Sequence, residues 1–274
     1  MTTIDRVLIL GCGYAGAALA RLARSRGLEV LVNVRSDARA AALKAEGFEV
    51  LQRATLDAGI AEHAGPHTHV VVAFPPDGVT DAVIASALHG VGALTYLSTT
   101  GVYGEHRGLV DDDTPLPTGP NDRSAKVRAA EDVYRTHGGT VLRCPALYGR
   151  DRGLHVRVVR GEHKIPGDGT RYLSRIHVDD LAQLVLASGT MEPVRGQTRV
   201  VGDLEPAPHG DVVRFICDAY GVPMPPFVPL ESVHESLRAD RRVDASRAIA
   251  ELGVTLRYPS YRDGMAPSAT GLTR

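Results

Sequence analysis

Lysine and cysteine are scarce in this sequence of 274 residues, and its charges nearly cancel. The 31 basic and 32 acidic side chains leave a formal net charge of -1, which gives no electrostatic basis for binding nucleic acid or an anionic membrane. Cys12, Cys144 and Cys217 lie far apart without a CxxC pair, which excludes a disulfide framework and a zinc site. No apolar run has the length of a membrane span or of a signal segment after a basic region. We therefore expect a soluble, cytoplasmic protein.

Short runs of Val, Ile and Leu alternate with alanine-rich stretches of helical period in the first half of the chain. Continuous apolar runs are typical of strands that are covered on both faces, as in a parallel sheet. The predicted strands are residues 6–10, 28–34, 48–51, 69–74, 93–98 and 140–144. The repeated strand–helix order predicts a doubly wound α/β fold of the Rossmann type.

The strand–helix rhythm stops after Gly149, where a polar segment begins. We predict a dinucleotide-binding domain over residues 1–150, to which residues 175–202 return. Residues 151–174 and 203–274 are expected to form a smaller C-terminal substrate lobe.

The sequence GCGYAG at residues 11–16 matches the GxGxxG pattern, directly after the first predicted strand and at the start of the first predicted helix. In that setting Gly11 permits a tight turn and Gly13 lets the backbone approach a pyrophosphate. Gly16 lets the helix pack on the strand, so that the anion meets the helix N-terminus. The alternative is a glycine-rich turn without a ligand.

The second predicted strand ends in NVRS, where an NAD enzyme usually carries the carboxylate that holds the ribose hydroxyls. No acid occurs here before Asp37, and Arg35 is followed by the hydroxyl of Ser36. A guanidinium beside a hydroxyl suits a ribose 2′-phosphate, so we predict NADP rather than NAD. Because nearly all basic residues here are arginine, a solvated surface arginine is the alternative interpretation of Arg35.

The predicted strand 93–98 ends in the hydroxyl-rich run LSTTGVYG, residues 97–104. These hydroxyls either shape a turn or supply a hydrogen bond to a reacting oxygen. Together with GCGYAG, LRCPALYG (142–149), GDGT (167–170) and RIHVDDLA (175–182), the run resembles the extended short-chain dehydrogenases, also called the NAD-dependent epimerase/dehydratase family. The resemblance covers nearly the whole chain.

The resemblance implies that Thr99 hydrogen-bonds the substrate oxygen and that Tyr103 lines the pocket wall. Ser98 and Thr100 are interpreted as neighbours that shape the turn. The residues expected to contact the dinucleotide are Gly11, Gly13, Tyr14, Ala15, Gly16, Arg35, Ser36, Phe74, Pro75 and Pro145.

The acid–base pair of the family, Tyr-x-x-x-Lys on the next helix, is incomplete in this chain. If Lys126 is the family lysine, Asp122 occupies the tyrosine position. If Glu131 sets the register, since a glutamate commonly follows that lysine by four residues, Val127 and Arg123 take the two places. The tyrosine that would exchange a proton with the substrate is absent in either register.

Two histidine-containing segments suggest other sites but are interpreted as structural. His63, His67 and His69 lie in a loop and before a strand, without cysteine or a well-spaced carboxylate, so we predict no metal site. The resemblance implies that His177 and the two aspartates after it are structural, with an aspartate capping the next helix.

The leading functional hypothesis is an NADP-dependent oxidoreductase that reduces an activated carbonyl or imine-type small molecule, because such a substrate needs no strong protein acid. Thr99, Tyr103 and Lys126 are the candidate catalytic residues, with Lys126 expected to point toward the cofactor ribose. The alternatives are a sugar-nucleotide epimerase or dehydratase, and a non-catalytic NADP-binding regulator or scaffold. The habit of the family also predicts a homodimer.

Overall fold

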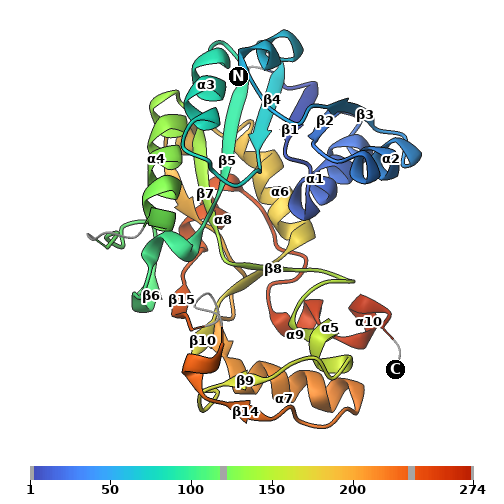
Figure 1. The fold of residues 1–274 in the computed structure, drawn as a ribbon, viewed down its shortest axis with the longest axis vertical. Coiled ribbons are helices and arrows are strands. Elements are labelled where there is room, and N and C mark those ends of the chain that lie inside the picture. Colours follow the sequence, from blue (N-terminus) through green and yellow to red (C-terminus); the bar gives the residue numbers. More distant parts are fainter. Residues whose placement is uncertain (1–2, 118–121, 234–237, 273–274) are drawn as a thin grey trace.

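A seven-stranded parallel sheet forms the centre of the molecule (Figure 1). The computed structural model describes residues 3–117, 122–233 and 238–272. The strand order is β12-β7-β5-β4-β1-β2-β3, and every neighbouring pair runs parallel. The strands are β1 (Arg6–Leu10), β2 (Glu29–Val34), β3 (Glu49–Gln52), β4 (Thr68–Val72), β5 (Ala93–Thr99), β7 (Thr140–Cys144) and β12 (Thr198–Val200). The predicted Rossmann-type α/β fold is confirmed.

Helices cover both faces of the sheet because its strands are apolar on both sides. In β1, Val7 and Ile9 pack against one layer of helices, and Leu8 and Leu10 pack against the other. The first layer contains α1 (Tyr14–Ser25), α2 (Asp37–Ala45), α6 (Val178–Ser188) and α8 (Ser246–Leu252). The second contains η1 (Ala58–His63), α3 (Thr80–Ala87) and α4 (Asp122–Thr136).

The strand predicted over residues 69–74 is shorter in the structure, where β4 ends at Val72. The next residues lead into Pro75 and Pro76, which have no backbone N–H to donate to a neighbouring strand. The chain therefore leaves the sheet here and passes over its edge.

A smaller layer lies beyond the carboxyl edge of the sheet (Figure 1). Its core combines α5 (Leu154–Val159), α7 (His209–Tyr220) and α9 (Tyr261–Gly264). The remaining elements are η2 (Thr100–Tyr103), β6 (Arg107–Val110), β8 (Ala146–Tyr148), β9 (Ile165–Pro166), β10 (Tyr172–Leu173), β11 (Arg175–His177), η3 (Glu192–Val194), β13 (Ala207–Pro208), β14 (Phe227–Val228), η4 (Leu230–Ser232), β15 (Asp240–Val243) and α10 (Pro267–Thr270).

Four two-stranded ladders tie this layer together, pairing β8 with β11, β6 with β15, β9 with β14, and β10 with β13. The division into domains at residues 150, 175 and 202 stays a prediction. No helix in the described parts of the chain is both long enough and apolar enough to cross a membrane.

The RIHVDD segment is structural, but its aspartate does not cap α6 as predicted. The cap is His177, whose Nδ1 accepts a hydrogen bond from the backbone N–H of Asp179 at 3.2 Å. Burial lowers the pKa of His177 to about 4, so its neutral ring can accept this bond. Asp180 is buried instead, and its carboxylate accepts the backbone N–H groups of Arg257 at 2.7 Å and Tyr258 at 2.8 Å. Asp180 thereby fastens the C-terminal segment to α6.

We predict that Asp180→Ala lowers the free energy of unfolding by about 2–5 kcal/mol, because two backbone N–H groups lose their acceptor. The matched control is Asp179→Ala in the same helical turn. Asp179 is half exposed, so its loss should cost about 1 kcal/mol or less. Urea unfolding followed by circular dichroism measures both values. Equal stabilities for the two variants would contradict the assignment.

Candidate functional site

The structure brings three of the predicted segments to one edge of the sheet. β1, β4 and β5 are adjacent and parallel, so their carboxyl ends lie side by side. GCGYAG follows β1, Phe74 and Pro75 follow β4, and LSTTGVYG ends β5. Open α/β sheets bind ligands at this edge, which makes it the candidate site.

The three glycines of the GCGYAG loop differ in what surrounds them. Gly11 has a φ of +84°, and a Cβ added there would lie 2.8 Å from the backbone nitrogen of Phe74. A Cβ on Gly16 would lie 3.1 Å from Cγ2 of Ile9, which confirms that helix and strand pack closely here. A Cβ on Gly13 would meet nothing nearer than the Gly11 oxygen at 3.9 Å. Gly13 therefore faces open space.

The N-terminus of α1 fits the phosphates of a dinucleotide. No side chain in the described parts of the chain caps α1 at Gly13, so its first N–H groups remain available to an anion. A bound dinucleotide would place its pyrophosphate in the space next to Gly13, and Ala15 lies half-buried in the same first turn.

Arg39 lies in α2 and holds the GCGYAG loop in place, a role that the sequence predictions missed. Its Nε donates to the Cys12 carbonyl at 3.1 Å, and its Nη2 donates to the Gly13 carbonyl at 3.0 Å. Ser36 caps α2 by accepting the backbone N–H of Arg39 at 3.4 Å. The Ser-x-x-Arg spacing after the second strand was the available signal, since it places the arginine in the first turn of α2.

Arg35 differs from Arg39 in having no partner among the described residues. Its side chain is exposed just after β2 ends. The predicted contacts of Arg35 and Ser36 with a ribose 2′-phosphate stay predictions.

Tyr14 is held by the segment that follows β8. Its hydroxyl lies against Gly149, and the Arg152 guanidinium lies 4.8 Å from the centre of its ring. Burial raises the pKa of Tyr14 to about 12, so this phenol stays protonated near neutral pH. Of the other predicted contacts, Pro75 is exposed and Pro145 is buried.

Thr99 both shapes the turn after β5 and remains exposed. Its Oγ1 accepts the backbone N–H of Gly101 at 3.0 Å and caps η2. The turn hydrogen bond predicted for its neighbours is thus made by Thr99 itself, because Ser98 donates to Glu131 and Thr100 is buried. Since Oγ1 acts as an acceptor toward Gly101, its own proton is left to donate to a ligand.

Tyr103 does not line a pocket wall as predicted. Its side chain is fully buried, and its hydroxyl donates to the Asp111 carbonyl at 3.1 Å and accepts from Arg143 Nη1 at 3.0 Å. Burial raises the pKa of Tyr103 above its ordinary value. The hydroxyl has no free proton to give, so Tyr103 does not replace the missing tyrosine.

A buried ion pair sets the orientation of α4. Arg143 Nη2 lies 2.7 Å from Oε2 of Glu131, and both side chains are at most 9% exposed. Val127 is buried on the same helix face, one turn before Glu131, whereas Lys126 is exposed. The structure therefore favours the register with Val127 at the family's lysine position. This geometry does not support the predicted contact of Lys126 with the cofactor ribose.

The side chains of Asp122 and Arg123, at the two possible tyrosine positions, lie outside the described part of the structure. Within that part, no group of three or more His, Cys, Asp or Glu side chains could hold a metal ion. His69, one of the three histidines considered, is buried in β4 with its Nε2 hydrogen-bonded to the Thr95 hydroxyl at 2.8 Å.

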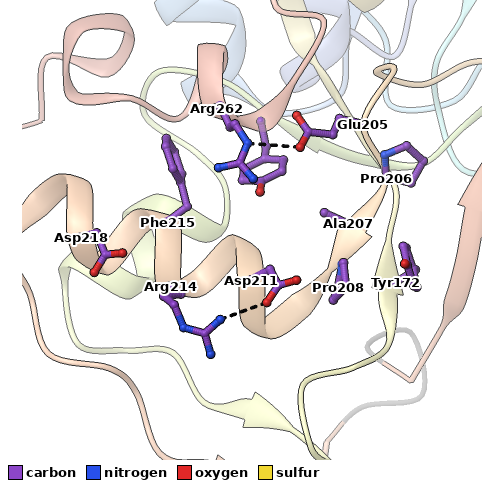
Figure 2. Close-up of a pocket in the computed structure, with 11 residues that line it drawn as sticks. Tyr172, Glu205, Pro206, Ala207, Pro208, Asp211, Arg214, Phe215, Asp218 and Arg262 are labelled. Atoms are coloured by element: carbon purple, nitrogen blue, oxygen red, sulfur yellow. Dashed lines mark hydrogen bonds and ion pairs between the residues drawn. The ribbon is translucent and has the colours of Figure 1, made fainter.

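A pocket of about 440 Å³ lies in the smaller layer, between α7, β13, β10 and α9 (Figure 2). Four of its charged side chains form two ion pairs. Arg262 lies 3.2 Å from Glu205, and Arg214 lies 3.1 Å from Asp211. None of the predicted site residues lines this pocket. The candidate site remains the edge of the sheet.

The fold is that of proteins that bind a nicotinamide dinucleotide. UDP-glucuronic acid 4-epimerase from Bacillus cereus, solved with UDP-glucuronic acid and NAD, is 17% identical, with a TM-score of 0.78 over 97% of both chains. Human epimerase family protein SDR39U1, solved with NADPH, is 17% identical, with a TM-score of 0.76 over 97% of this chain and 100% of the other. The resemblance to the NAD-dependent epimerase/dehydratase proteins is thus confirmed at the level of the fold.

Two proteins are more similar in sequence. A 3-diazoavenalumate denitrifying reductase from a Streptomyces species is 28% identical over 95% of this chain and 99% of the reductase. A conserved protein of unknown function from Silicibacter pomeroyi is 29% identical, with a TM-score of 0.80 over 95% of this chain and 96% of the other. No protein-family model matches the chain. The relatives with a named activity include a reductase, epimerases and a dehydratase.

We predict that Gly13→Ala weakens the binding of both NADPH and NADH by at least about 10-fold, because the added methyl group occupies the space beside the N-terminus of α1. The free energy of unfolding should change by no more than about 1 kcal/mol, since that space is open in the protein itself. Fluorescence titration with each cofactor and urea unfolding measure the two effects. Unchanged binding of both cofactors would place the pyrophosphate elsewhere.

Proposed function

We propose that the protein is an NADPH-dependent reductase of a small electrophilic molecule whose reduction needs no proton from the protein. One observation carries the proposal. At the carboxyl edge of the sheet, the hydroxyl of Thr99 can donate a hydrogen bond, while Tyr103 is held in the interior and Lys126 is exposed. This edge can position a substrate beside a nicotinamide, and neither candidate register of α4 supplies the family's tyrosine for proton exchange.

The reductase relative indicates the chemistry that suits such a site. Its name describes the denitrifying reduction of a diazo compound. When an aromatic diazonium cation is reduced to the arene, one hydride is taken up, the carbon–nitrogen bond breaks and N₂ leaves with no net uptake of protons. We propose this class as the substrates of the protein, together with iminium-type cations and activated carbonyls that carry the proton which their alkoxide product takes up.

The residues of the chain have distinct proposed roles. A bound NADPH supplies the hydride. The N-terminus of α1 and the backbone near Gly13 hold its pyrophosphate, with Arg39 fixing the carbonyls of the same loop. Thr99 donates to a heteroatom of the substrate and so orients the electrophilic centre.

The proposed preference for NADPH rests on the different surroundings of Arg35 and Arg39. The Arg39 guanidinium is held by the Cys12 and Gly13 carbonyls, whereas Arg35 is exposed and unpaired among the described residues. An unpaired guanidinium at the end of β2 can bind a 2′-phosphate with charge-assisted hydrogen bonds.

Sugar-nucleotide epimerisation is the alternative that the solved relatives suggest. It requires oxidation of the substrate and proton exchange in turn, and the buried Tyr103 cannot provide the proton step. Reduction by positioning alone is therefore the better-supported proposal.

A homodimer, expected from the habit of the family, is proposed with α3 and α4 as the candidate interface helices. Val79 and Val83 are both exposed at α3, where an apolar contact could form.

We predict that Arg35→Ala weakens NADPH binding by about 10- to 100-fold and leaves NADH binding unchanged, because only NADPH carries the 2′-phosphate. The matched control is Arg26→Ala, an exposed arginine at the opposite end of α1, which should affect neither cofactor. Titrations of the purified variants with both cofactors measure the ratio of NADPH affinity to NADH affinity. Equal losses for NADPH and NADH would show that Arg35 does not read the phosphate.

We predict that Thr99→Val lowers kcat by about 10- to 100-fold at saturating NADPH, because the substrate loses its hydrogen-bond donor. Thr99→Ser keeps the hydroxyl and should retain most of the activity. The assay follows NADPH oxidation by 3-diazonio-4-hydroxybenzoate, whose ring oxygen beside the diazonium group can accept this hydrogen bond, corrected for the reaction without enzyme. Full turnover by Thr99→Val would show that Thr99 only shapes the turn and does not contact the substrate.

A further inference from the structure

Arg241 differs from the other arginines in the interior of the molecule. Arg143 is paired with Glu131, and Arg199 lies 2.6 Å from Glu251. Arg241 is half-buried on β15 and forms no ion pair with any described residue. Burial lowers its pKa, as expected for a cation that has lost solvent without gaining a carboxylate.

Burial lowers the pKa of a second arginine, Arg175, but the carboxylate of Asp203 lies near enough to oppose that effect. Arg175 is also almost fully buried and stacks on the Tyr261 ring. Arg241 is thus the partly desolvated cation that has no carboxylate nearby among the described residues.

The backbone around Arg241 is fixed by the side chain of one residue. The Ser174 hydroxyl donates to the Arg241 carbonyl at 2.9 Å and accepts the backbone N–H of Val243 at 2.8 Å. β15 also pairs in register with β6, with Arg241 opposite Gly108. Because both sides of the residue are held, its side chain has a defined direction.

That direction is toward the LSTTGVYG segment. Nη1 of Arg241 donates to the Gly104 carbonyl at 2.6 Å. Gly104 follows η2, the single turn that Thr99 caps. With a rise of about 2 Å per residue in a 3₁₀ turn, the backbone advances about 10 Å from Thr99 to Gly104, which is about the length of a small aromatic acid.

Most of the donors of Arg241 remain available. A guanidinium has five N–H groups, and one is used by the Gly104 carbonyl. No nitrogen of Arg241 is among the buried atoms that lack a partner, so its remaining N–H groups reach solvent. A carboxylate matches this fork with two parallel hydrogen bonds.

We propose that Arg241 binds a carboxylate group of the substrate, at the end remote from the electrophilic centre held at Thr99. The inference rests on the proposed function and narrows its substrate class to carboxylate-bearing aromatic electrophiles. The name of the reductase relative's substrate, an avenalumate, is also that of an acid anion.

The test compares trans-cinnamate with its neutral analogue cinnamamide, each titrated by calorimetry into the protein saturated with NADP⁺. The native protein should bind cinnamate at least about 10-fold more tightly than cinnamamide. Arg241→Ala should remove this difference by weakening cinnamate alone, with cofactor binding unchanged. Arg241→Gln can still donate to the Gly104 carbonyl without the charge, and it should lose cinnamate binding in the same way.

Arg242→Ala is the matched control, because adjacent residues of a strand point to opposite faces. Arg242 is exposed and stacks 4.2 Å from the centre of the Tyr172 ring, so its removal should leave cinnamate binding unchanged. The parallel kinetic measurement uses 4-carboxybenzenediazonium and benzenediazonium. Arg241→Gln should raise KM for 4-carboxybenzenediazonium by at least about 10-fold. The KM for benzenediazonium should stay unchanged.

The outcomes separate the two proposals. If the native protein does not prefer cinnamate, or if Arg241→Gln weakens cinnamate and cinnamamide equally, the carboxylate site is overturned. If cinnamate binding depends on Arg241 while the native protein reduces neither diazonium salt, the carboxylate site stands and reduction of diazonium substrates is refuted.

Discussion

The buried ion pair between Glu131 and Arg143 determines which side chains remain available at the edge of the sheet. It joins α4 to β7. The Ser98 hydroxyl also donates to Glu131, and Arg143 also donates to the Tyr103 hydroxyl. Charges that are removed from water need such partners, because an unpaired buried charge is strongly unfavourable. The hydroxyl of Thr99, outside this network, is left free to meet a ligand.

Under the proposed function, separate parts of the site would hold the cofactor and the substrate without the family's tyrosine. The backbone at the N-terminus of α1 would hold the cofactor, and Thr99 would orient the reacting group. Arg241 would fix the far end of the molecule, so that binding energy from a remote group holds the electrophile in place. A substrate that releases N₂ or starts as a cation supplies the driving force that proton transfer supplies elsewhere.

The fold and the phosphate loop could be predicted from the sequence, because the apolar strand pattern and the GCGYAG glycines depend only on residues that are close together in the chain. The catalytic residues were harder, because their roles depend on distant partners. Tyr103 is locked by Arg143, 40 residues away, and Arg241 meets Gly104 across 137 residues. The cap of α6 was misassigned because burial keeps His177 neutral and makes it an acceptor, which the RIHVDD sequence does not reveal.

The most direct measurement is the rate of a single turnover of 4-carboxybenzenediazonium, with NADPH deuterated at the transferred position and with D₂O as solvent. A reductase that needs only hydride and positioning should slow with the deuterated cofactor and run at the same rate in D₂O and H₂O. A turnover that slows in D₂O, and falls as an acidic group loses its proton, would show that a side chain donates a proton in the rate-limiting step and would contradict the account.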